Sequence, residues 1–316
     1  MNIGVVLTSR NNSGMLTEWH NANSYSGVDV LNIDEDSAPE EKEKLKNLCD
    51  KYNITYMDRE ERGMQNNILT ACNYFEDRGI DWVCYFQHDA FTLEDDFFKR
   101  LDTYLASGKL DETGVIGFNF LNGPIELEKY NGEDTELFTI ARCPLEPGDS
   151  WYRHKIRGHA NGWTPPADKK TPFAVESVSW MAALVKISQY KKYIEPTGDY
   201  QFYHAWDDIA FQFLYNNVYN VVIPQFRLGH DQEKKVKYGL PLSSPTSTSK
   251  REHFYGKWGH HDVWKDRWGF EYDNDRCRPQ FEQVKQNYEN TLLMDFYNHN
   301  PKNGPLKSFP EWRSEG

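Results

Sequence analysis

The segment DWVCYFQHDAFTLEDDFF, residues 81–98, changes character twice within 18 residues. Its first part, residues 82–86, is short, apolar and rich in aromatic side chains, which predicts a buried β-strand. The strand ends in three polar residues, Gln87, His88 and Asp89. Polar side chains at the carboxyl end of a buried strand lie where open α/β sheets bind ligands, whereas the structural alternative is an aspartate that caps the next helix. Acids followed by apolar residues at helical spacing predict that helix at residues 92–101.

The chain before this segment alternates between strand and helix patterns. Apolar runs that end in polar residues predict strands at residues 3–7, 28–33 and 54–57. Amphipathic spacing predicts helices at residues 14–24, 40–52 and 64–77. A β-α-β-α-β-α-β order implies a parallel sheet with right-handed crossovers and polar strand ends along one edge.

The second half is less regular. Strands are expected at residues 114–120, 175–186 and 221–224, the last continuing to His230, with helices at residues 187–193 and around 206–214. Residues 121–172 are rich in Gly, Pro, Asn and charge and are interpreted as loops with short elements, and residues 233–253 as a mobile loop.

Composition favours a soluble globular protein. The 316 residues contain 38% hydrophobic and 27% charged side chains, and no apolar run approaches the roughly 18 residues of a membrane span. The first residues enter a strand pattern directly, so no signal peptide is expected. The five cysteines are scattered and odd in number, which fits reduced thiols in a cytoplasmic protein.

The net charge of −12 is unevenly distributed. Residues 1–150 hold 13 basic and 29 acidic side chains, a net charge of −16, whereas residues 151–316 hold 23 and 19, a net charge of +4. The overall acidity argues against non-specific binding to nucleic acids, and the second half leaves an anionic partner open.

Six stretches in this order resemble the family 2 glycosyltransferases of the GT-A fold. They are IGVVLTSRNN, LNIDEDS, ERGMQNNILTACN, YFQHDAFTLEDDFFKRL, WDDIAFQFLYNNVYNVVIPQFRLGH and HFYGKWG. The resemblance implies an α/β, Rossmann-like nucleotide-diphospho-sugar transferase fold, with a mostly parallel central sheet flanked by helices. It covers residues 1–260 as one domain, and residues 261–316 are expected to form a C-terminal extension packed on that domain.

The resemblance also implies a divalent metal, Mn²⁺ or Mg²⁺, on the donor diphosphate. Asp89 takes the place of the metal-binding aspartate of the DxD motif, and His230 that of the distal histidine ligand. Gln87 replaces the first aspartate of the motif, and a neutral amide is a weaker metal ligand. The structural alternative for His230 is a surface or capping histidine.

A transferase of this kind needs a base that deprotonates the acceptor hydroxyl. By resemblance, Asp208 takes the position of that base in the family's acidic motif, and Asp207 that of the residue that supports it. Both carboxylates are also placed where acids favour a helix N-terminus, which is the structural alternative.

Further residues are carried over as donor contacts. They are Thr8, Arg10, Asp34, Asp36, Arg62, Asn67, Gln87, His88, Lys257 and Trp258. Lys257 and Trp258 would close over the diphosphate, and packing of the tail is their structural alternative.

The expected function is inverting transfer of a hexosyl or pentosyl group from a nucleotide-sugar, with a UDP-sugar favoured, to an acceptor hydroxyl. A saccharide precursor is the favoured acceptor and a modified DNA base the second. The alternative class is a GT-A-like module that binds nucleotide-sugars without turnover, which Gln87 suggests. A nucleotidyltransferase is disfavoured because SRNNSG lacks a glycine-rich activating loop.

Overall fold

The computed structural model describes most of residues 1–231 and one helix beyond them. The described residues are 1–60, 63–122, 138–139, 141–142, 154–155, 172–175, 177–178, 181–200, 205–231, 237 and 260–268.

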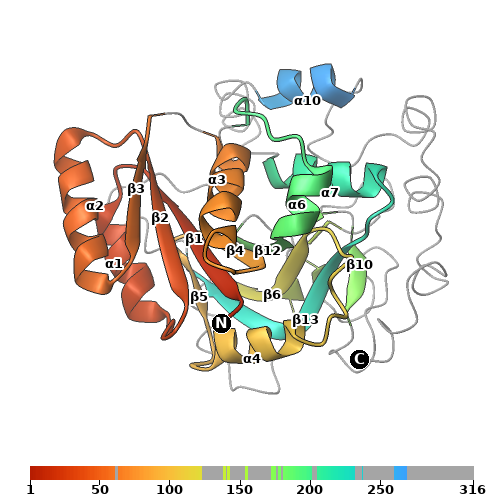
Figure 1. Cartoon of the computed structure of the whole chain (residues 1–316), viewed down its shortest axis with the longest axis horizontal. Coiled ribbons are helices and arrows are strands. Elements are labelled where there is room, and N and C mark those ends of the chain that lie inside the picture. Colours follow the sequence, from red (N-terminus) through yellow and green to blue (C-terminus); the bar gives the residue numbers. More distant parts are fainter. Residues whose placement is uncertain are drawn as a thin grey trace.

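The first four strands and the helices between them form the expected alternation (Figure 1). They are β1 (Ile3–Ser9), α1 (Ser13–Ala22), β2 (Asp29–Glu35), α2 (Pro39–Tyr52), β3 (Thr55–Arg59), α3 (Met64–Glu76) and β4 (Trp82–Phe86). β1 pairs in parallel with both β2 and β4, and β2 pairs in parallel with β3. The carboxyl ends of these four strands therefore lie along one edge of the sheet.

The later elements extend this sheet and change its character. They are β5 (Ala90–Thr92), α4 (Phe97–Leu105), β6 (Ile116–Asn122), β7 (Phe138–Thr139), β8 (Ala141–Arg142), β9 (His154–Lys155), β10 (Phe173–Val175), β11 (Ser177–Val178), β12 (Ala182–Lys186), α6 (Ile187–Tyr193), α7 (Ala205–Tyr215), β13 (Asn220–His230) and α10 (His260–Trp268). The main strand order is β10-β13-β6-β12-β4-β1-β2-β3.

The sheet is mixed: the parallel pairing expected for the first four strands is confirmed, and antiparallel strands join it in the second half. β12 runs antiparallel to both of its neighbours, β4 and β6, and β10 and β5 run antiparallel to β13. The pattern at residues 175–186 predicts one strand, but apolar runs do not reveal the breaks between β10, β11 and β12. The helix expected at residues 92–101 begins later, at Phe97, because residues 90–92 pair with β13.

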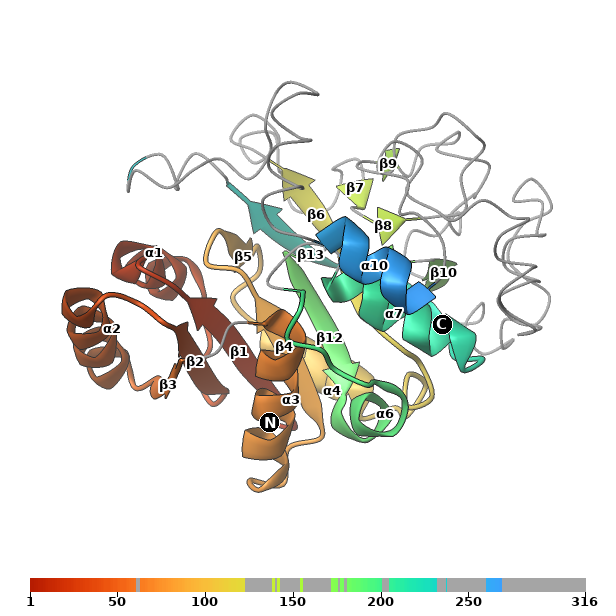
Figure 2. The ribbon, with the colours of Figure 1, turned by 90° about the horizontal axis from the view of Figure 1, so that it is seen from above.

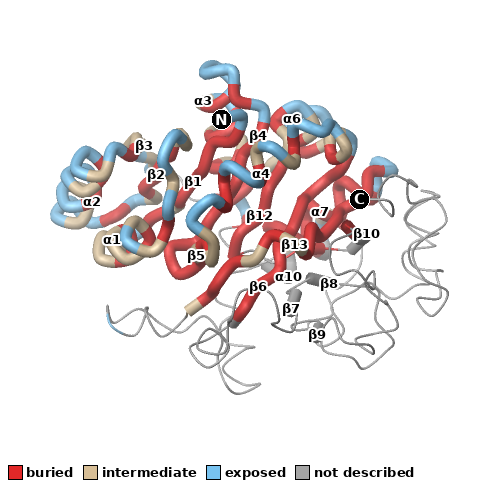
Figure 3. The backbone as a smooth tube through the Cα atoms, turned by 90° about the horizontal axis from the view of Figure 1, so that it is seen from below, coloured by how far each residue is buried: buried red, intermediate tan, exposed pale blue. Residues whose placement is uncertain are grey.

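Helices cover both faces of the sheet (Figure 2). α1 and α4 lie on one face, where Trp19 packs against Phe86 and Phe97 against Phe118. α3, α6 and α7 lie on the other face, where Trp206 of α7 packs against Tyr85 of β4. Apart from the edge strand β3, which is mostly half-buried, the strands between these layers are almost continuously buried (Figure 3), so their sequences are short apolar runs.

The register between β13 and β6 shifts between Ile223 and Arg227, and the two strands go on pairing past the shift as far as His230. Pro224 lies in this bulge, where its missing N–H breaks no ladder hydrogen bond. Past the bulge, β13 pairs with β5, and His230 lies opposite Ala90. The bulged strand thus carries its last residue to the polar end of β4.

α10 packs on α7 through two tryptophans. The rings of Trp264 and Trp268 lie 5.5 and 4.7 Å from that of Phe211. The boundary expected at residue 260 stays a prediction, and residues 269–316 lie outside the described part. Cys49, Cys72 and Cys84 are buried free thiols, as expected. None of the helices described is long and apolar enough to cross a membrane.

Candidate active site

Asp89 and His230 meet at the carboxyl edge of the sheet. Asp89 follows β4, His230 ends β13, and the His230 Nε2 and Asp89 Oδ2 atoms are 3.0 Å apart. The backbone N–H of Asp231 donates to the carbonyl oxygen of Asp89 at 3.1 Å, which ties the two chain segments together. Both side chains are buried. The two residues that the resemblance pairs, 141 positions apart, are therefore neighbours in space.

The chemistry of this pair fits a divalent cation. Carboxylate oxygen and imidazole nitrogen are suitable ligands for Mn²⁺, and two adjacent ligands of an octahedral ion lie about 3 Å apart. Within the described residues, no group of three or more His, Cys, Asp or Glu side chains gathers as a metal site. A metal ion held by few protein ligands has coordination positions left for substrate phosphates and water.

Ser9 and Asn32, which the sequence patterns do not single out, connect His88 to the first two strands. The Ser9 hydroxyl donates to Asn32 Oδ1 at 2.5 Å and lies 3.2 Å from His88 Nε2. All three side chains are buried. The polar loop after β1 is visible in the sequence, but the last residue of the strand itself carries this contact.

At the end of β2, the side chain of Glu35 is more accessible to a ligand than that of Asp34. The Asp34 carboxylate accepts hydrogen bonds from the hydroxyls of Ser37, at 2.5 Å, and Tyr56, at 2.9 Å, and is fully buried. Glu35 Oε1 accepts from the Asn67 amide at 2.6 Å and from the Gly63 N–H at 3.1 Å. Burial raises the pKa of Glu35, and these two donors partly offset the rise.

The other donor-contact candidates are spread along the same edge. Thr8 is half-buried, with its hydroxyl 3.3 Å from that of Tyr85. Arg10 is exposed, and Asp36 is exposed with a left-handed φ of 60°. Arg62, Lys257 and Trp258 lie outside the described residues.

Two amide side chains are buried at this edge with unsatisfied polar atoms. Tyr85 of β4 and Gly117 of β6 both lie opposite Ala183 of β12. Gln87 and Asn119 each come two residues later in the chain. They therefore lie at the same height in the sheet, on the face that α7 covers. Within the described part of the chain, neither Gln87 Nε2 nor either polar atom of Asn119 has a hydrogen-bond partner. Asn119 escapes prediction from the sequence because the pattern of its strand, residues 114–120, indicates only core.

The acidic pair of α7 is divided between two environments. Asp207 is 8% exposed and accepts a hydrogen bond from the Ser177 hydroxyl at 2.7 Å. Asp208 is fully buried, and both of its oxygens accept hydrogen bonds from other side chains. The contact of Trp206 with Tyr85 places the start of α7 beside the carboxyl end of β4.

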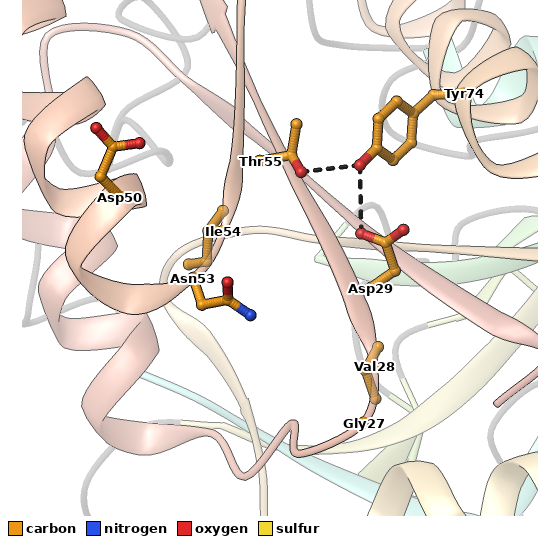
Figure 4. A pocket seen from close by; sticks show the side chains of 8 residues that line it. All are labelled: Gly27, Val28, Asp29, Asp50, Asn53, Ile54, Thr55 and Tyr74. Atoms are coloured by element: carbon orange, nitrogen blue, oxygen red, sulfur yellow. Dashed lines mark hydrogen bonds between the residues drawn. The ribbon is translucent and has the colours of Figure 1, made fainter. Parts of the chain in front are cut away.

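A hollow at the opposite edge of the sheet does not belong to this site (Figure 4). It is lined by Gly27, Val28, Asp29, Asp50, Asn53, Ile54, Thr55 and Tyr74. These residues surround the beginnings of β2 and β3, and several of its polar groups bond to one another. The Tyr74 hydroxyl is 2.8 Å from that of Thr55 and donates to Asp29 at 3.4 Å.

Two solved structures with a similar fold are glycosyltransferases. One is GalNAc-T7 with UDP, GalNAc and Mn²⁺, at 15% identity and a TM-score of 0.52, with 84% of this chain and 50% of that chain covered. Another is the mannosyltransferase PcManGT from Pyrobaculum calidifontis in complex with GDP-Man and Mn²⁺, at 13% identity and a TM-score of 0.52, with 99% and 72% covered. The chain thus spans half the length of the GalNAc-T7 chain. No family model and no curated protein matches the sequence.

These likenesses define the fold of the chain, which is GT-A: a curled, mixed sheet with helices on both faces. The recognition of this fold from six short stretches of sequence is confirmed.

Proposed function

We propose that this protein is a glycosyltransferase that moves a sugar from a nucleoside-diphosphate donor to an acceptor hydroxyl. The observation that carries the proposal is the Asp89–His230 pair at the carboxyl edge of a GT-A sheet. Support comes from the two solved structures of this fold, whose names include a nucleotide or nucleotide-sugar together with Mn²⁺.

In this proposal Asp89 and His230 hold a divalent ion, Mn²⁺ or Mg²⁺. The bound ion would neutralise the charge that develops on the diphosphate leaving group. The chain's own residues orient the donor around it. Glu35, Asn67 and Gly63 form a polar corner at the end of β2 and the start of α3, suited to the hydroxyl groups of a ribose.

The unsatisfied amides of Gln87 and Asn119 would bind hydroxyl groups of the sugar or the acceptor. Burying an amide without a partner costs about 1–3 kcal/mol, and a ligand hydroxyl that completes its hydrogen bonds removes this cost. Gln87 thus acts as a hydroxyl-binding residue at the position where the DxD motif has a metal ligand.

The transfer itself is a single displacement with inversion at the anomeric carbon. The acceptor oxygen forms a bond to that carbon, the bond to the diphosphate breaks and its electron pair leaves with the nucleoside diphosphate. The acceptor proton passes to a carboxylate of the Asp207–Asp208 pair. A saccharide precursor is the acceptor class favoured, with a UDP-sugar as donor.

A thermal-shift titration tests this function. UDP-GalNAc and GDP-mannose are added with and without Mn²⁺ to the wild type, to Asp89→Asn and to the exposed control Asp95→Asn. Ligand present at about 100 times its Kd stabilises a protein by about 2.7 kcal/mol, which raises Tm by several degrees.

We expect a Mn²⁺-dependent rise in Tm with one donor for the wild type and for Asp95→Asn. Asp89→Asn should lose it. Absence of any rise with these and other nucleotide-sugars would contradict the proposed function. A rise without nucleotide release, across a panel of acceptors, would instead identify a binding module.

A further inference from the structure

Asp208 lies at the centre of a closed network of hydrogen bonds. Its Oδ2 atom accepts from the amides of Gln65 and Gln212, each at 2.8 Å. Its Oδ1 atom accepts from the Trp268 indole at 2.7 Å and from the Tyr200 hydroxyl at 3.4 Å. The Arg267 guanidinium is 3.3 Å from the same oxygen. A carboxylate can accept about four hydrogen bonds, so its capacity is filled.

These partners come from several elements around the start of α7. Gln65 belongs to α3 and also donates to the Ala205 carbonyl at 3.0 Å, while its own Oε1 accepts from the Thr197 N–H at 2.9 Å. Arg267 and Trp268 belong to α10, and Arg267 also donates to the Glu195 carbonyl at 2.8 Å. Asp208 thus joins α3, the segment before α7 and α10 to one another.

Asp207 points elsewhere, since consecutive helical residues are rotated by about 100°. Its hydrogen bond from Ser177 comes from β11, and β11 packs on β6, where Val178 covers Gly117. Asn119, with its unsatisfied amide, lies two residues further along β6 on the same face. Asp207 therefore lies on the side of α7 that faces β11 and the level of the sheet at which Gly117 and Tyr85 lie.

We propose that Asp207 is the general base and that Asp208 is a positioning residue that fixes Asp207 by anchoring α10 and α3 to the start of α7. This inference rests on the proposed glycosyl transfer and reverses the roles that the resemblance assigns to the two residues. The acceptor hydroxyl proton moves to the Asp207 carboxylate as the acceptor oxygen bonds to the anomeric carbon. The nucleoside diphosphate leaves with the electron pair of the broken bond.

Three variants test the division of roles: Asp207→Asn, Asp208→Asn and Trp268→Phe. Each is measured for Tm and for the kcat, KM and pH profile of UDP or GDP release from UDP-GalNAc or GDP-mannose with Mn²⁺. Trp268→Phe removes one hydrogen bond to Asp208 and leaves both carboxylates in place. It therefore weakens the hydrogen-bond network of Asp208 and leaves the proposed base, Asp207, unchanged.

We expect Asp207→Asn to lower kcat on the order of 10²- to 10⁴-fold and to remove the acid limb of the pH profile, with Tm and the donor-induced rise in Tm unchanged. Asp208→Asn should lower Tm by roughly 5 °C or more, because an amide cannot accept all of these hydrogen bonds. It should keep the acid limb, at a reduced kcat. Trp268→Phe should lower the same two quantities as Asp208→Asn, Tm and kcat, but by smaller amounts.

The opposite pattern would overturn the inference: Asp207→Asn within about twofold of wild-type kcat, or Asp208→Asn inactive at unchanged Tm. A failure of the proposed function looks different, because the wild type itself would then release no nucleotide. In that case the Tm of Asp208→Asn against that of Asp207→Asn still tests whether Asp208 anchors α3 and α10 to α7.

Discussion

Among single side chains, Asn119 combines complete burial with an amide that bonds to nothing in the described part of the protein. Interiors seldom leave such groups unpaired, and the exceptions concentrate where a ligand completes the hydrogen bonds. The Nε2 atom of Gln87, at the same level of the sheet, also lacks a hydrogen-bond partner among the described residues. We therefore expect the ligand-free protein to be less stable than it would be if these buried amides had hydrogen-bond partners.

Asn119→Leu tests this expectation. Leu has the same branched arrangement of non-hydrogen atoms as Asn and needs no hydrogen bonds. The free protein should therefore become more stable by about 1 kcal/mol. The rate of nucleotide release should fall roughly tenfold, because the ligand loses a hydrogen-bond partner. Urea unfolding and steady-state kinetics give the two values. The exposed Asn73→Leu is the control and should change neither. A less stable Asn119→Leu protein with normal activity would show that the amide is structural.

Among the elements, α3 begins in a conformation that only glycine adopts easily. Gly63 has a φ of +140°, and a Cβ atom there would lie 3.1 Å from the Gly198 backbone. Its N–H donates to Glu35 at the site. The tight approach of the segment at residues 197–200 thus fixes both the start of α3 and the polar corner.

Gly63→Ala should lower the free energy of unfolding by about 2–3 kcal/mol and raise the KM for the donor. Gly79→Ala is the matched control, because Gly79 also has a positive φ, of 72°, but has nothing within 4 Å of a Cβ. It should cost only about 1–2 kcal/mol and leave KM unchanged. Equal losses in the two variants would contradict a steric role for Gly63.

The network between α3, α7 and α10 also predicts a pH dependence. Burial raises the pKa of Asp208, and Arg267 and the amide donors offset the rise only in part. A carboxyl whose folded pKa is raised contributes stability that is complete below its unfolded pKa, about 4, and is lost as pH rises through the folded value.

The stability of the wild type relative to Asp208→Asn should therefore decrease from about pH 4 to neutral pH. The decrease amounts to about 1.4 kcal/mol for each pH unit that separates the folded pKa of Asp208 from its unfolded pKa. Chemical denaturation of both proteins across this range measures the difference, because the other titrating groups are common to both. A difference that grows with pH would show that the carboxylate is stabilised in its charged form instead.

At the scale of the whole molecule, the sequence was most informative where patterns are local. β1 to β4 and the helices between them were predicted because short apolar runs and amphipathic helices alternate there. Asp89 and His230 were paired by resemblance, although nothing local brings them together. That contact depends on the bulge at Pro224 and on the pairing of β5 with β13.

What the sequence could not reveal depends on long-range geometry. The reversed β12 makes the sheet mixed, yet a buried strand has the same apolar pattern in either direction. The closed environment of Asp208 requires Trp268, 60 residues away, and the unsatisfied amide of Asn119 is an absence of contacts that no motif records. Glu35 was missed because the resemblance points to the aspartates on either side of it.

The location of the metal ion tests the central claim most directly. Crystals grown with Mn²⁺ and UDP or GDP should show an anomalous scattering peak about 2.1 Å from both an Asp89 carboxylate oxygen and His230 Nε2, in contact with the diphosphate. The same crystals of Asp89→Asn should lack it. A nucleotide bound at this edge with no Mn²⁺ between Asp89 and His230, or with the ion held by other residues, would contradict the account.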